Sequence, residues 1–65
     1  MNLLMECRFY GVRLSQVAEL TGFTTSYVRQ VLLRERHNED ITGLTIVALK
    51  NRKQELLNEL LRESA

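Results

Sequence analysis

The stretch from residue 14 to residue 33, LSQVAELTGFTTSYVRQVLL, constrains the fold of this 65-residue chain more than any other segment. It contains two short segments with apolar residues at helical spacing, separated by Gly22. Two helices that pack at a steep angle need a small residue where their axes approach, and Ala18 provides one. The tight turn between them needs a residue that tolerates a positive φ, which Gly22 does. Four apolar side chains are then expected to face the core: Val17, Phe23, Val28 and Val31. This arrangement predicts a helix-turn-helix over about residues 15–33.

Capping residues predict where the first three helices begin and end. Asn2 is a suitable N-cap for a first helix that stops at Gly11, because glycine adopts the left-handed conformation at little cost. Ser15 and Thr24 are expected to cap the two helices on either side of Gly22.

A long helix is expected to close the chain. It should start at Asp40 or Thr42, and its regular part should cover about residues 43–63. Three of its apolar residues are expected to pack on the core: Leu44, Val47 and Ala48.

Composition favours an all-helical domain. The chain has no proline and three glycines, too few turn residues for the many turns of an all-β fold. Hydrophobic residues make up 45% and charged residues 26%, which is typical of a folded globular protein. Cys7 is the one cysteine, so an intramolecular disulfide is excluded, and Cys7 and His37 lack the paired spacing of a zinc site. We therefore expect one compact all-α domain over residues 1–65. The expected number of helices is four, within bounds of three to five.

Localisation and charge give weaker indications. The longest apolar runs are four or five residues, too short to span a membrane, and the first residues lack a secretory signal. A cytoplasmic protein is therefore expected. The net charge is +1, with five arginines against three glutamates before His37 and four basic against five acidic residues after it. This is a mild version of the basic footprint that nucleic-acid-binding proteins carry.

The segment around Gly22 resembles the helix-turn-helix of bacterial and phage repressors. It is similar to the headpiece of the lac-repressor family in its Val17-Ala18-Glu19 triplet, in Gly22 four residues after Ala18, and in its valine-rich second helix. The expected preceding helix is more similar to the lambda-repressor and Cro group, and Thr21 stands where many lac-family members have leucine. The resemblance covers residues 14–33, about a third of the chain, and extends loosely through residues 38–49.

This resemblance implies that the second helix of the motif enters the major groove of double-stranded DNA. The implied base contacts are Thr25, Ser26 and Gln30, and a glutamine can pair with adenine through both N6 and N7. Contacts to the DNA backbone are implied for Thr24 and Arg29, and further candidates for the backbone are Arg13, Gln16, Tyr27 and Arg34.

Two other interpretations of the motif remain open. Thr24, Thr25 and Ser26 are also the residue types that helices favour at their starts, so they could form a simple capping cluster. Helix-turn-helix geometry also occurs in modules that bind only protein.

The expected last helix carries a leucine cluster near its end: Leu56, Leu57, Leu60 and Leu61. A monomer of this size would leave much of this stripe in water, and exposed apolar patches usually mark interfaces. We expect a homodimer through these leucines, with help from Leu3 and Leu4. The alternative is that the first helix covers the leucines within one chain.

Together these features predict a sequence-specific DNA-binding transcriptional regulator. The expected type is a small phage or plasmid repressor that binds a palindromic operator as a homodimer. No catalytic residues, metal, cofactor or small-molecule effector is expected, because the sequence has no phosphate-binding loop, nucleophile-and-base set or metal spacing. The alternative function is a protein-binding adaptor, such as an antirepressor or a polymerase partner, that uses the leucine-rich helix.

Overall fold

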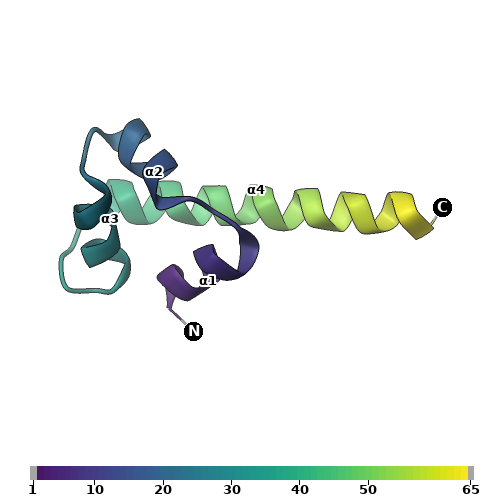
Figure 1. The fold of residues 1–65 in the computed structure, drawn as a ribbon, viewed down its shortest axis with the longest axis horizontal. Coiled ribbons are helices and arrows are strands. Elements are labelled where there is room, and N and C mark those ends of the chain that lie inside the picture. The colour runs from purple at the N-terminus through teal and green to yellow at the C-terminus, as the bar shows by residue number, and fades with distance from the viewer. Residues whose placement is uncertain (1, 65) are drawn as a thin grey trace.

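Helices form most of residues 2–64, the part of the chain that the computed structural model describes. In order they are α1 (Leu3–Tyr10), α2 (Leu14–Thr21), α3 (Thr25–Leu32) and α4 (Glu39–Ser64), and there is no strand in this range. The three short helices pack against the first part of α4, whose remainder extends well past them (Figure 1). The expected all-α fold with a long C-terminal helix is confirmed.

The helix caps follow the sequence at most positions. The Asn2 side chain accepts a hydrogen bond from the Met5 N–H at 2.9 Å, and Thr24 Oγ1 accepts one from the Tyr27 N–H at 3.1 Å. Gly11 and Gly22 end α1 and α2 in the left-handed conformation, with φ of 76° and 78°.

Two predicted helix starts are wrong. The N-cap of α2 is Arg13, which makes no side-chain capping bond, so Ser15 lies inside the first turn. Helix α4 begins at Glu39 because the Asn38 side chain accepts a hydrogen bond from the Ile41 N–H at 3.1 Å. Gly43 is therefore inside the helix, not at its beginning.

A single core joins the four helices. Its buried apolar residues are Leu4 and Cys7 from α1, Val17 and Ala18 from α2, Val28, Val31 and Leu32 from α3, and Ile41 and Leu49 from α4. Thr45 is also fully buried, and its hydroxyl donates to the Ile41 carbonyl at 2.8 Å, so no polar group is left without a partner there.

Four predicted core positions are corrected by the structure. The face of α4 that packs inward carries Ile41, Thr45 and Leu49, whereas Leu44 and Val47 are 36% and 53% exposed and Ala48 is half-buried. Phe23 does not fold into the core: it is 42% exposed, and its ring lies 4.9 Å from that of Tyr27.

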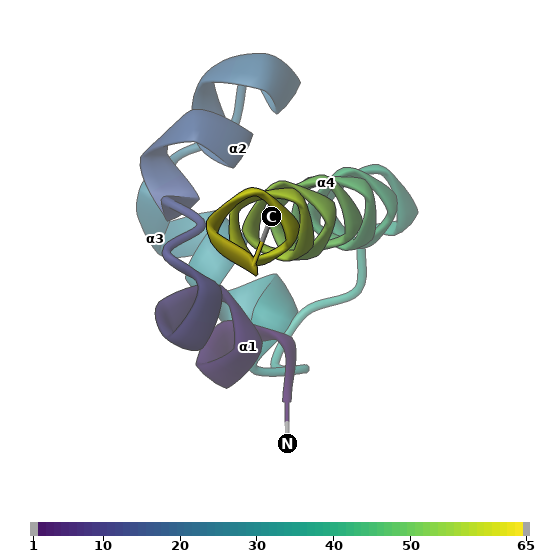
Figure 2. The ribbon, with the colours of Figure 1, turned by 90° about the vertical axis from the view of Figure 1, so that its right-hand side faces the viewer.

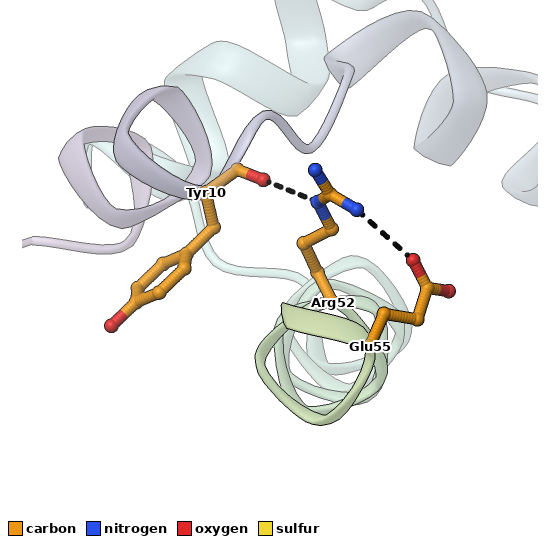
Figure 3. Close-up of polar contacts among 3 residues, drawn as sticks. All are labelled: Tyr10, Arg52 and Glu55. Atoms are coloured by element: carbon orange, nitrogen blue, oxygen red, sulfur yellow. Dashed lines mark hydrogen bonds and ion pairs between the residues drawn. The ribbon is translucent and has the colours of Figure 1, made fainter. Parts of the chain in front are cut away.

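Polar contacts hold α1 against the middle of α4. Arg52 Nε donates to the Tyr10 carbonyl at 2.9 Å while its Nη1 binds Glu55 at 3.1 Å (Figure 3). Lys53 Nζ lies 3.4 Å from Glu6 and 5.0 Å from the centre of the Tyr10 ring. None of the helices in residues 2–64 combines the length and the apolar composition that a membrane-spanning segment requires.

Candidate nucleic-acid interface

The turn between α2 and α3 sets how α3 is presented. Gly22 ends α2 with its N–H bonded to the Ala18 carbonyl at 2.9 Å, and two residues later Thr24 caps α3. Because Val28, Val31 and Leu32 are all buried, the rotation of α3 about its own axis is fixed. The opposite side of α3 is consequently held in a defined orientation toward solvent.

The side chains on the outward side of α3 are mostly exposed. Thr25, Ser26 and Arg29 are exposed, whereas Gln30 is half-buried. Ser26, Arg29 and Leu33 follow one another at helical spacing and share the side that faces away from the core. Leu33, which is 40% exposed, was not among the predicted site residues, although its place one turn after Arg29 could have indicated it.

An open hollow lies between α2 and the start of α3. It brings together four of the predicted DNA contacts, namely Arg13, Gln16, Thr24 and Thr25. Ser15 and Glu19 also line it, and neither was predicted. The sequence predicted Ser15 as the N-cap of α2. Because the N-cap is Arg13, Ser15 makes no cap and instead lines this hollow. Glu19 places a negative charge where a phosphate would otherwise be attracted.

The other predicted contacts lie away from this hollow. Tyr27 is half-buried, and its ring packs against Phe23. Arg34 is exposed at the far end of α3, where it lines a second hollow together with Arg36 and His37. The structure thus places one predicted contact, Arg34, apart from the others, in a hollow that Glu35 also lines.

The arginines of this surface form no ion pair within the described residues, although Glu19 lines the same hollow as Arg13. The ion pairs among residues 2–64 are Arg52 with Glu55 and Lys53 with Glu6, and His37 Nε2 lies 3.9 Å from a Glu39 carboxylate oxygen. Arg13, Arg29 and Arg34 are therefore available to an anionic partner. No group of three or more metal-ligating side chains occurs in the same part of the chain.

Arg34 has an unusual backbone conformation. It lies in the left-handed region with φ of 66°, and it is the one non-glycine residue with positive φ in the described chain. Its N–H bonds the Val31 carbonyl at 3.0 Å and the Glu35 N–H bonds the Gln30 carbonyl at 2.9 Å, which is the Schellman pattern that ends helices. Glycine is the usual residue at this position, so an arginine here has a conformational cost.

The cluster of predicted dimer residues lies on the part of α4 that extends past the other helices (Figure 1). Leu57, Leu60 and Leu61 are 49%, 61% and 60% exposed, and Leu56 is half-buried. The α1 contacts with this helix reach Arg52 and Lys53 and leave these leucines largely uncovered. Leu4 is buried in the core of its own chain, so it cannot contribute to an interface as expected.

No family model, curated protein or solved structure matches this chain.

Proposed function

We propose that the chain is a sequence-specific, double-stranded-DNA-binding transcriptional regulator. The observation that carries the proposal is the exposed start of α3, where Thr25, Ser26 and Arg29 are exposed on a helix whose rotation is fixed by three buried residues. Side chains held in this way can fit a DNA groove without the entropy cost of first ordering a loop. An α-helix fits the major groove, where base pairs differ in their donor and acceptor patterns.

The roles of the residues follow from their positions. Ser26 and Thr25 offer short hydroxyls to base edges at the start of α3, with Gln30 one turn further along. Arg13, Gln16 and Thr24 would meet one phosphate backbone through the hollow beside α2, and Arg29 and Arg34 would meet the backbone further along α3. Tyr27 contributes through its hydroxyl alone because its ring packs against Phe23.

The regulator is proposed to act as a homodimer, in the manner of a small phage or plasmid repressor in the cytoplasm. The exposed leucines of α4 support this part of the proposal. A dimer with two-fold symmetry binds two half-sites about 34 Å apart, and its operator is therefore an approximate palindrome. Occupying such a site would block transcription.

The test is selection of bound sites from a random DNA pool, followed by fluorescence anisotropy of the enriched duplex at several salt concentrations. Affinity should fall steeply as salt rises, because lysine and arginine contacts release condensed counterions. Absence of binding at low salt would contradict the proposal and favour a protein-binding adaptor.

Two variants and a control separate the proposed contacts. Gln30→Ala should weaken binding by about 1–3 kcal/mol at a single base position, whereas Arg29→Ala should weaken binding to all sequences and reduce the salt slope by about one. Met5→Ala, at an exposed position on α1 outside both proposed contact surfaces, should leave DNA affinity unchanged.

A further inference from the structure

One side of α4 is uncovered along nearly its whole length. Viewed along α4, the helices α1, α2 and α3 gather on one side of it and leave the opposite side open (Figure 2). The residues of this side, here called the outer face, are Gly43, Ile46, Val47, Lys50, Gln54, Leu57 and Leu61, and all of them are exposed. At about 100° per residue they lie within roughly 50° of one direction, which is about 150° from the buried Thr45.

The outer face has a nearly symmetric pattern along the helix. Apolar residues lie at both of its ends, Ile46 and Val47 at one and Leu57 and Leu61 at the other, and polar residues lie between them. A two-fold interface brings the same surface of two copies together, so it must be complementary to itself. A pattern that is similar in both directions meets this requirement when the two helices run antiparallel.

We infer that α4 pairs with α4 of a second copy in antiparallel orientation through the outer face. This inference rests on the homodimer of the proposed function and specifies how its two copies are arranged. In the register that matches the apolar ends, Ile46 lies opposite Leu61 of the second copy and Lys50 lies opposite Leu57 of the second copy. Each exposed apolar end is then covered by the other.

The charge on the outer face distinguishes the two orientations. Lys50 lies near its centre line, so a parallel pair would place Lys50 against Lys50 of the second copy. In the antiparallel pair the aliphatic stem of Lys50 can pack on a leucine while its ammonium group stays in water. The antiparallel arrangement thus avoids a like-charge contact that the parallel one requires.

Gly43 fits the same arrangement. Glycine weakens the interior of a helix, and here no neighbour within the chain requires it, because an added Cβ would meet nothing within 4 Å. A second helix that approaches the outer face closely gives this glycine a packing role.

The length of the contact also favours the whole face over the leucines alone. Residues 43–61 extend over about 27 Å of helix, whereas residues 57–61 extend over about 6 Å. Two helices in contact over the longer distance bury on the order of 1,000 Å², the size at which specific interfaces begin.

Disulfide cross-linking in the full-length chain tests the orientation. The native Cys7 is only 1% exposed, so an introduced cysteine is the one that reacts. An equimolar mixture of Ile46→Cys and Leu61→Cys chains should form a mixed disulfide dimer on mild oxidation. Neither variant alone should do so, because two copies of residue 46 would be about 22 Å apart along the pair, far beyond disulfide reach.

The control is Glu59→Cys, an exposed position on the opposite side of α4, which should not cross-link with Ile46→Cys. Self-linking of each single variant would indicate a parallel pair and overturn the inference, as would the absence of any mixed product. The light-scattering mass of the unmodified chain gives a second readout, and a mass of one subunit at high concentration would overturn it too. DNA binding by the same samples is measured separately, so a cross-linked dimer that ignores DNA would reject the proposed function and leave the pairing in place.

Discussion

Arg34 can be tested both for backbone strain and for a contact between its side chain and DNA. Its left-handed φ of 66° disfavours any residue with a Cβ, and glycine would remove that cost. Arg34→Gly should therefore raise the free energy of unfolding by about 1 kcal/mol in urea denaturation. If Arg34 contacts a phosphate, the same variant should bind DNA more weakly, so stability and affinity would move in opposite directions.

The matched control is Gly22→Ala, at the corresponding left-handed position that ends α2. Its φ is 78° and a Cβ would meet no atom within 4 Å, so the strain is purely conformational. This variant should lower the free energy of unfolding by about 1 kcal/mol. An Arg34→Gly protein no more stable than the unmodified chain would contradict the assigned strain.

Cys7 should make stability depend on alkaline pH. Burial, and secondarily the neighbouring Glu6 carboxylate, raise the pKa of the Cys7 thiol above its ordinary value of 9.0. The unfolded chain then loses this proton at a lower pH than the folded chain does. The contribution to stability is complete below the unfolded pKa and is lost as pH rises through the folded pKa.

The measurement is urea unfolding between pH 7 and 10.5 for the unmodified chain and for Cys7→Val, which keeps a similar apolar volume. The unmodified chain should lose more stability above about pH 9 than the variant does. Parallel curves for the two proteins would show that the thiol has no part in the effect.

At the scale of the helices, the sequence predicts where each short helix lies better than it predicts how the helices pack against one another. The caps at Asn2 and Thr24 and the stops at Gly11 and Gly22 are local features, and the structure has all four. The candidate contacts on α3 could likewise be placed on one helix. The sequence could not predict that residues of α2 and of the start of α3 line one hollow, because that depends on how the two helices pack.

The side of α4 that packs on the core was predicted wrongly from the sequence. Helix α4 carries apolar residues on two sides, one buried through Ile41 and Leu49 and one exposed through Ile46 and Val47, so apolar spacing alone does not define a single stripe. The buried side also contains Thr45, a polar residue whose hydroxyl is satisfied by its own helix. The spacing of apolar residues in the sequence therefore does not indicate that Thr45 is buried.

Two truncations test which face of α4 carries the core. Leu49 is 3% exposed and Val47 is 53% exposed. Leu49→Ala should lower the free energy of unfolding by about 2–5 kcal/mol because it leaves a cavity, a large share of the stability of so small a domain. Val47→Ala should cost well under about 1 kcal/mol in dilute solution, where pairing between copies is negligible. Equal losses in thermal or urea unfolding would mean that the assigned faces are wrong.

The whole molecule is elongated for its length, which links its stability to its own concentration. The radius of gyration is 13.0 Å and the extents are 44 × 23 × 16 Å, whereas a compact chain of this size would have a radius of about 11 Å. The difference comes from the last turns of α4, which extend past the three short helices (Figure 1). An isolated helical segment of this kind is marginal in water, so pairing with a second copy should stabilise it.

The melting temperature of the unmodified chain should therefore rise by several degrees when its concentration is increased a hundredfold, because association stabilises the folded state by mass action. Leu57→Glu places a charge on the outer face, so its melting temperature should be independent of concentration and equal to the dilute value of the unmodified chain. Glu59→Gln, on the opposite side of α4, should retain the concentration dependence. A melting temperature of the unmodified chain that does not change with concentration would contradict the pairing, since a monomer gains nothing from its neighbours.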